Sequence, residues 1–210
     1  DHNASIYYRN VTGGAIRNAT VADSTSTQGG IVLRNTSGTV VADAEVSVSG
    51  TGINVQGDAR DNWIERVRIA TGSIAVEDAH NTTIVDALVR ASPVHGVELT
   101  NADGSTVSTV EVRDAGQDGI SVTDTTSANV TDITVDAVDE NGIFLQRVNS
   151  SRIAHVNVRN ASRAGVEAID AASIELKEFS LGNLSTGVDF ESVADSRVLN
   201  VTSANVSRHG

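Results

Sequence analysis

Apolar residues recur along this chain with a spacing close to 23 residues. The repeat is easiest to see between Gly119 and Gly165, where each apolar residue of one segment has an apolar counterpart 23 positions later. The paired positions are Ile120 with Ile143, Val122 with Leu145, Val130 with Ile153, Ile133 with Val156, and Val135 with Val158.

The same pattern divides the whole chain into nine units. We take the residue after each recurring Gly or Ser as slot zero of a unit, and successive units begin 21 to 25 residues apart. Apolar residues then fill slots zero, two, ten, thirteen and fifteen, and we expect only the last unit to depart, at Ser203 in slot fifteen. The units begin at Ile6, Ile31, Ile53, Ile74, Val97, Ile120, Ile143, Val166 and Val188.

The spacing within a unit predicts strands and turns only. Apolar residues two apart share one face of a strand, whereas the step of three between slots ten and thirteen indicates a bend. No unit sustains the 3.6-residue period of a helix. Because one unit cannot bury its own apolar residues, the units are expected to stack into an all-β solenoid.

Glycine precedes slot zero in most units, with Ser5 and Ser73 as the exceptions. Glycine tolerates a positive φ or a close backbone approach, so we expect a sharp corner before each first strand. The glycines are Gly30, Gly52, Gly96, Gly119, Gly142, Gly165, Gly187 and Gly210.

With these apolar slots and glycine corners, the sequence resembles a right-handed parallel β-helix of the pectate-lyase-like superfamily, with repeats similar to the carbohydrate-binding, sugar-hydrolase and NosD-type group. The resemblance covers the whole chain and implies one domain, residues 1–210, of about nine coils. We see no capping segment before Ile6 or after Gly210, and therefore expect either an excerpt of a longer β-helix or a subunit stacked end to end on copies of itself.

Composition narrows the partners. The net charge of −12, with Lys177 as the single lysine, disfavours nucleic acid and anionic membrane surfaces. No stretch approaches the ~20 apolar residues of a membrane span, and the absence of cysteine excludes disulfides and thiolate metal sites. The acidic, lysine-poor composition resembles that of proteins from salt-loving archaea.

Slots one and three are expected to point away from the core. Their columns end in three carboxylates, Glu167, Asp189 and Glu191, of which the first two fall on neighbouring coils. Such a pair could serve as acid and base in glycoside hydrolysis, or bind Ca²⁺ as hard oxygen ligands. No Arg or Lys stands in the same two columns beside the three carboxylates. A solvated acidic face without catalysis and without a bound cofactor is therefore favoured.

Two further sets of residues were considered as sites. Slot sixteen carries three arginines and one aspartate, namely Arg90, Arg113, Asp136 and Arg159, and could bind an acidic glycan. We favour instead an exposed ladder of ion pairs in which Asp136 and Asp114 balance the arginines. The other set, His80, His95 and His155, occupies different offsets, so we expect no shared metal site.

Asn-x-Ser/Thr sequons are more frequent than composition predicts. The chain has eleven, whereas roughly three are expected by chance. They occupy several slots, so no single turn motif explains them, and glycosylation on an extracytoplasmic surface is predicted. The candidate asparagines are Asn3, Asn10, Asn18, Asn35, Asn81, Asn129, Asn149, Asn160, Asn183, Asn200 and Asn205.

The sequence therefore favours a non-enzymatic, glycosylated structural β-helix at the cell surface or outside the cell, such as a fibre component or adhesin-like stalk. One alternative is a lyase, hydrolase or epimerase acting on an acidic polysaccharide. Another is a viral tail-spike or receptor-binding module, for which the outward apolar residues Val32, Ala75 and Phe144 are too scattered to form the expected stripe.

Overall fold

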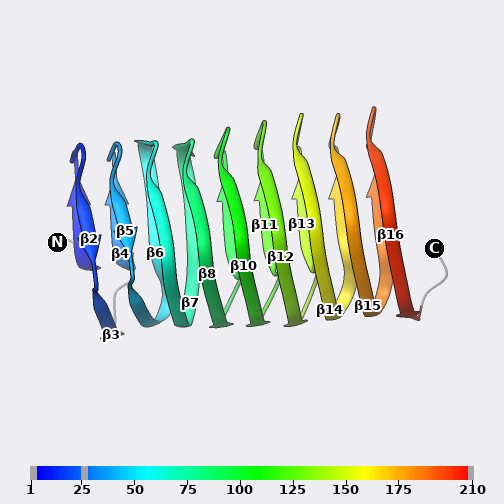
Figure 1. The fold of residues 1–210 in the computed structure, drawn as a ribbon, viewed down its shortest axis with the longest axis horizontal. Coiled ribbons are helices and arrows are strands. Elements are labelled where there is room, and N and C mark those ends of the chain that lie inside the picture. Colours follow the sequence, from blue (N-terminus) through cyan, green and yellow to red (C-terminus); the bar gives the residue numbers. More distant parts are fainter. Residues whose placement is uncertain (1–3, 25–27, 208–210) are drawn as a thin grey trace.

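The computed structural model describes residues 4–24 and 28–207, and these form a parallel β-solenoid of about nine turns (Figure 1). The coils lie side by side along the long axis, in chain order from the amino end to the carboxyl end. The described residues contain no helix, and hence none that could cross a membrane. The predicted all-β architecture is confirmed.

Sixteen strands make up the described coils, and the longest of them bend through a corner and so belong to two faces of the solenoid. In chain order the strands are β1 (Ala4–Arg9), β2 (Ala15–Arg17), β3 (Thr20–Ser24), β4 (Gly29–Arg34), β5 (Val40–Ala42), β6 (Glu45–Arg60), β7 (Trp63–His80), β8 (Thr83–Ser92), β9 (Val97–Thr100), β10 (Thr106–Ala115), β11 (Ile120–Thr123), β12 (Asn129–Val138), β13 (Ile143–Gln146), β14 (Arg152–Ile169), β15 (Glu175–Glu191) and β16 (Arg197–Val206).

The strands pair in parallel, in the register that the repeat predicts. Strand β11 pairs with β13 so that Val122 lies beside Leu145, and both side chains are 0% exposed. Each apolar slot thus stacks on the same slot one coil away, which buries the ladder against itself. Burying a Val or Leu side chain contributes about 1.5–3 kcal/mol, so stacking is the main source of stability.

The third coil departs from the expected slots. Ile64, rather than Trp63, pairs with Val41 and Ile84 and is 0% exposed. The register shifts between Gln56 and Ala59, so the coil holds one more residue before its second strand. The expectation that only the last unit departs from the pattern is therefore wrong, and Trp63 projects outward with 43% of its surface exposed.

Most corner glycines are required for space rather than for a positive φ, whereas a Cβ on Gly187 would meet only ordinary contacts at 3.8 and 3.9 Å. A Cβ on Gly142 would lie 2.6 Å from the carbonyl oxygen of Gly165 and 2.5 Å from Cγ2 of Val158. The backbone of one coil thus approaches the next too closely for any side chain. Gly210 lies outside the described residues.

Left-handed residues supply the other bends, and on each coil they recur at the same slots. Asn10, Asn35, Asn101 and Asp124, for example, follow the first strand of their coils with φ between 49° and 55°. Asn and Asp adopt this conformation more readily than other residues with a side chain. Stacked amides then join the coils, as where Nδ2 of Asn35 donates to Oδ1 of Asn10 at 3.2 Å.

We predict that Gly142→Ala lowers the free energy of unfolding by about 1–3 kcal/mol, because the new methyl group must displace backbone or Val158. The matched control is Gly50→Ala, where a Cβ would have no neighbour within 4 Å. That change should be neutral or stabilise by about 0.4–1 kcal/mol. Denaturant midpoints of the two variants test this, and equal midpoints would contradict the close-approach explanation.

Candidate functional site

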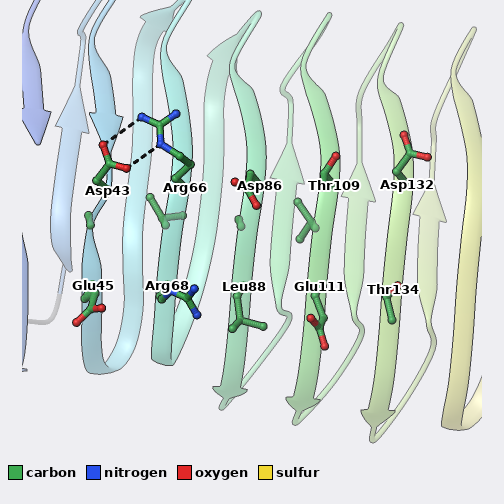
Figure 2. Close-up of a pocket in the computed structure, with 14 residues that line it drawn as sticks. Asp43, Glu45, Arg66, Arg68, Asp86, Leu88, Thr109, Glu111, Asp132 and Thr134 are labelled. Atoms are coloured by element: carbon green, nitrogen blue, oxygen red, sulfur yellow. Dashed lines mark hydrogen bonds and ion pairs between the residues drawn. The ribbon is translucent and has the colours of Figure 1, made fainter. Parts of the chain in front are cut away.

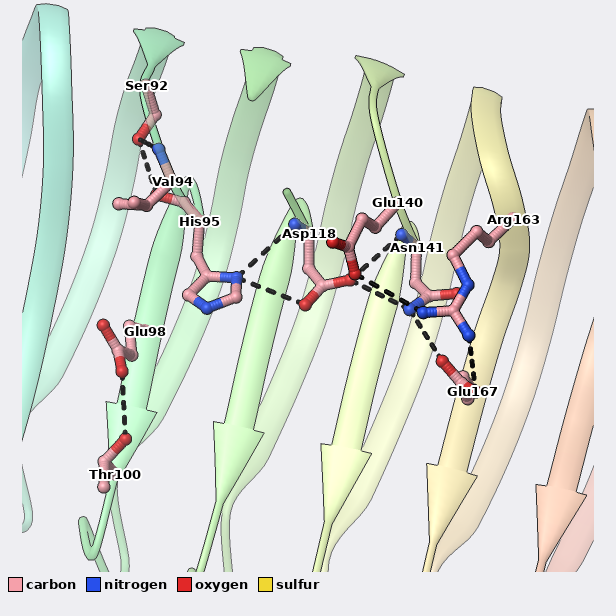
Figure 3. A network of polar contacts seen from close by, with 10 residues as sticks. All are labelled: Ser92, Val94, His95, Glu98, Thr100, Asp118, Glu140, Asn141, Arg163 and Glu167. Atoms are coloured by element: carbon pink, nitrogen blue, oxygen red, sulfur yellow. Dashed lines mark hydrogen bonds and ion pairs between the residues drawn. The ribbon is translucent and has the colours of Figure 1, made fainter. Parts of the chain in front are cut away.

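A row of interlocked polar side chains runs along one edge of the first sheet, which contains β9, β11, β13 and the end of β14 (Figure 3). We call it the edge row: His95, Asp118, Asn141, Glu167 and Arg163. The first three stand two residues before slot zero on successive coils, 23 residues apart. The same register that stacks the apolar core therefore aligns these groups parallel to the solenoid axis.

Asp118 lies at the centre of the edge row and is only 3% exposed. Its Oδ1 accepts hydrogen bonds from the backbone N–H and from Nδ2 of Asn141, both at 3.0 Å. Its Oδ2 lies 3.2 Å from Nδ1 of His95. A buried carboxylate is tolerated only when it is paired and hydrogen-bonded, and these contacts meet that requirement.

Asn141 connects Asp118 to Glu167. The amide is 1% exposed, and its Nδ2 donates to Oε2 of Glu167 at 2.8 Å as well as to Asp118. Its Oδ1 accepts the backbone N–H of Ala164 at 3.1 Å. Both amide hydrogens are therefore used, and this fixes the orientation of the side chain and of the two carboxylates beside it.

His95 is the titratable end of the edge row. Burial of the ring lowers its pKa, but the hydrogen bond with Asp118 raises it, and the charges of Glu98 and Glu140 act in the same direction. The net result is a pKa of His95 above its ordinary value. The carboxylates around the ring therefore favour the protonated form of the imidazole.

Arg163 closes the other end of the edge row. Its guanidinium lies 3.5 Å from Oε1 of Glu167 and 3.5 Å from Oε2 of Glu140. Sequence reasoning missed this cation because it searched only the outward columns of the sheet. Arg163 comes from the corner before the strand, where the recurring polar residues one to three places before slot zero were the available signal.

The three carboxylates expected from the sequence are brought together only in part. Glu167 and Asp189 are register partners on β14 and β15, as predicted, whereas Glu191 pairs with Ile169. Both oxygens of Glu167 are engaged, by Asn141 and Arg163, while Asp189 and Glu191 are exposed. No group of three or more His, Asp or Glu within residues 4–24 and 28–207 is placed to hold a metal ion.

The outward face of the first sheet is less exposed than predicted. The slot-one column has the expected register, yet Val32, Asn54, Ala75 and Ser121 are 0–9% exposed. Ser121 lies between the longer Glu98 and Phe144 of the adjacent coils, whereas Val32, Asn54 and Ala75 are neighbours of one another. The slot-one column therefore offers little exposed surface at these positions.

The slot-sixteen arginines form the expected column, since Arg113 pairs in register with both Arg90 and Asp136. The ion pair of Arg113 is with Glu111, two residues earlier on β10, rather than with the aspartates that the sequence suggested. Histidines are separated, as expected: Nδ1 of His95 faces Asp118, while His155 lies within 3.2 Å of Asp132 and 2.8 Å of Glu178.

A groove lies on another face of the solenoid, across strands β6, β7, β8, β10 and β12 (Figure 2). This groove has a volume of about 680 Å³ and is lined by charged and small polar side chains with Leu88 among them. Asp43 and Arg66 pair at one side of it, with distances of 2.7 and 3.1 Å, and the pairing lowers the pKa of Asp43. Its charged groups are exposed, so the edge row, with two buried members, is the better-organised site.

Backbone conformation accounts for much of the sequon excess. Of the ten sequon asparagines within the described residues, eight have positive φ, and Asn129 and Asn149 do not. Left-handed turns recur at several slots in every coil, so turn conformation gives these asparagines a structural role beside the predicted glycosylation. Asn3 lies outside the described residues. The left-handed asparagines are Asn10, Asn18, Asn35, Asn81, Asn160, Asn183, Asn200 and Asn205.

Comparison with known proteins supports the architecture. The family model described as a right handed beta helix region matches residues 4–181. No curated protein sequence gives a significant match.

Solved structures with the same fold act in different contexts. The periplasmic alginate epimerase AlgG is 14% identical with a TM-score of 0.80, over 91% of this chain and 50% of that one. The catalytic domain of a GH87 α-1,3-glucanase in complex with tetrasaccharides is 11% identical with a TM-score of 0.72, over 93% and 49%. An enzymatically active tailspike domain of bacteriophage CBA120 is 14% identical with a TM-score of 0.68, over 92% and 39%. This chain therefore spans about half or less of each, and these identities show the fold alone.

The raised pKa of His95 predicts a pH-dependent contribution to stability. A group with a raised pKa in the folded state stabilises fully below its unfolded pKa, which is about 6.5 for His, and loses that effect as pH rises through the folded value. His95→Gln should therefore lower the melting temperature more at about pH 5 than at about pH 9. Thermal denaturation of both proteins at the two pH values measures this, and an equal or reversed difference would contradict the assigned contact with Asp118.

Proposed function

The chain belongs to the right-handed β-helix family, and from that premise we propose that it binds a polysaccharide along the edge row of the first sheet. The protein is a surface or extracellular component in this proposal, and binding does not require cleavage of the glycan.

The observation that carries this proposal is the edge row itself. It presents polar groups one coil apart, at the ~4.8 Å spacing of parallel strands. A pyranose ring in a linear glycan is about as long as that spacing, so a glycan of a few sugars lying along the solenoid axis would extend from His95 to Arg163. Because Asp118 and Asn141 are buried and fixed, the exposed parts of His95, Glu167 and Arg163 are pre-organised for hydrogen bonds to hydroxyl groups.

The charge of the site selects the glycan. The edge row and its neighbours carry five carboxylates, Glu98, Asp118, Glu140, Glu167 and Asp189, against His95 and Arg163. An anionic polymer would meet net repulsion here, and the whole chain has a net charge of −12. We therefore favour a neutral or amino-sugar polysaccharide over the acidic one considered from the sequence.

Binding fits the site better than catalysis. A glycosidase needs one carboxylate free to act as base or nucleophile and another as acid. Glu167, the best candidate from the sequence, uses both oxygens in contacts with Asn141 and Arg163, and Asp189 stands exposed without a comparable partner. A non-enzymatic role thus remains our proposal, while the enzymes among the structural neighbours make turnover the alternative to test.

The neighbours also support the location. One is named a periplasmic enzyme and another a phage tailspike, and both kinds of protein work outside the cytoplasm. A tailspike-like module remains a second form of the same proposal, since it too would bind a surface glycan.

End-to-end stacking is a second candidate role, favoured by apolar exposure in the last described coil. Phe190 and Val198 are 37% and 42% exposed, whereas Ala168 and Leu176, the core residues with which they pair on the preceding coil, are 0% exposed. Further coils of the same chain or another copy would cover them. Electron microscopy would show axial rods if copies stack, and discrete particles at high concentration would contradict a copy as the partner.

We predict that Arg163→Ala weakens binding to an insoluble neutral glucan or chitin by about tenfold, the cost of a lost charged hydrogen-bond donor. The control is Arg159→Ala, an exposed arginine on a different face that should leave binding unchanged. Co-sedimentation measures both. Equal loss in the two variants would contradict the assigned face, and release of reducing ends or unsaturated products would contradict the non-enzymatic role.

Glycosylation of the native protein is predicted to be partial. The amides of Asn160, Asn183 and Asn205 form one stacked ladder, in which Nδ2 of each donates to the preceding coil. Bulky glycans on neighbours ~4.8 Å apart would collide, so we expect Asn183 not to be modified together with Asn160 or Asn205. Peptide mapping by mass spectrometry tests this, and full occupancy of all three would contradict it.

A further inference from the structure

Trp63 is the only tryptophan in a chain with six aromatic residues, and it faces solvent with 43% exposure. The extra residue in the third coil moves it out of the ladder, where Ile64 takes the core position. A large apolar ring left outside while small aliphatic residues fill the core calls for a ligand, because Tyr and Trp are typical of binding surfaces that are apolar at one end and wet at the other.

The indole is held in place by charged neighbours. Its Nε1–H donates to Oε2 of Glu65 at 3.1 Å, and Oε1 of Glu65 accepts from Arg66 at 2.8 Å and lies 4.0 Å from Arg17. Arg66 is in turn fixed by two hydrogen bonds to the carboxylate of Asp43, at one side of the groove shown in Figure 2. The ring is therefore oriented before any ligand arrives, which lowers the entropy lost on binding.

The residues paired in register with Trp63 have small side chains. Its register partners on the adjacent coils are the small residues Val40 and Thr83, both half-buried. On the neighbouring outward column, Glu65 lies between Ala42, which is 0% exposed, and Val85. Neither register partner has a long side chain, so a ring-shaped ligand can lie over Val40 or Thr83 against the indole.

We propose that Trp63, with Glu65 and Arg17 beside it, is a second glycan-binding site that stacks a neutral sugar ring, on a different face from the edge row. The ion pairs that begin at Glu65 join two carboxylates and two guanidinium groups, so their net charge is zero: Asp43, Glu65, Arg17 and Arg66. An uncharged ligand is therefore the complementary one. The ring supplies an apolar face for the C–H side of a pyranose, and the charged groups supply donors and acceptors for its hydroxyls. The choice of a glycan rests on the proposed function; the site itself rests on Trp63.

Because the chain has a single tryptophan, its intrinsic fluorescence reports on this site alone. We expect a saturable change in emission when the protein is titrated with neutral glucose tetrasaccharides, 1,3-linked or 1,4-linked, and none with an alginate tetramer. The absence of a saturable change with the neutral sugars, or a change with alginate only, would overturn the proposal. A change produced instead by an added protein, with none from the neutral sugars, would assign the surface to a protein partner and overturn it as well.

Variants separate this site from the edge row. Trp63→Ala should weaken retardation in affinity electrophoresis through a soluble neutral glucan by about tenfold, and Trp63→Phe by less, since a ring is retained. Leu199→Ala, which removes another exposed apolar side chain, is the matched control and should have no effect. If Arg163→Ala leaves the fluorescence titration intact, the two sites are independent. If neutral sugars change the fluorescence while Arg163→Ala has no effect on co-sedimentation, the edge row is rejected as a binding site and the Trp63 site is supported. If Arg163→Ala weakens co-sedimentation while neutral sugars leave the fluorescence unchanged, the Trp63 site is rejected.

Discussion

The structure depends on one constraint, the stacking of each coil on the next in a fixed parallel register. A single coil has no interior of its own, so its Val, Ile and Leu side chains are buried only by the same slots of its neighbours, as Val122 is by Leu145. The backbone ladder and the apolar ladder enforce the same register, because a slip by one residue would turn every core side chain outward. The corner glycines follow from this closeness, since the carbonyl of Gly165 occupies the place of a side chain on Gly142.

The same register organises the polar groups. His95, Asp118 and Asn141 meet because they hold equivalent positions on successive coils, and the burial of Asp118 is possible because the coils on either side supply its partners. Stacking thus turns a one-dimensional sequence repeat into an axial line of fixed hydrogen-bonding groups. Where one coil holds an extra residue, as before Trp63, a side chain leaves the ladder and becomes available on the surface. Both proposed glycan contacts are consequences of the register. The edge row forms where the register is kept, and Trp63 is exposed where the register is interrupted.

Sequence periodicity predicted the ladder well because apolar burial has a simple period. It also predicted that Glu167 and Asp189 would be neighbours, since both lie in the same outward slot. It failed where position depends on atoms outside the repeat. Arg163 reaches Glu167 from a corner, the third coil holds one extra residue before Ile64, and Ser121 lies between longer residues on adjacent coils. The left-handed conformation of Asn10 and its equivalents also does not follow from apolar alternation, because it depends on where the backbone turns.

Cross-linking tests the register most directly, because the chain has no cysteine of its own. Thr123 and Gln146 are register partners on β11 and β13. Adjacent strands are ~4.8 Å apart, which lies within the range of about 4.4–6.8 Å between the Cα atoms of a disulfide. The account predicts that Thr123→Cys with Gln146→Cys oxidises to an intramolecular disulfide in the folded protein. Thr123→Cys with Leu145→Cys should remain reduced, since those side chains point to opposite faces. Efficient cross-linking of the second pair, or none of the first, would contradict the stacked register.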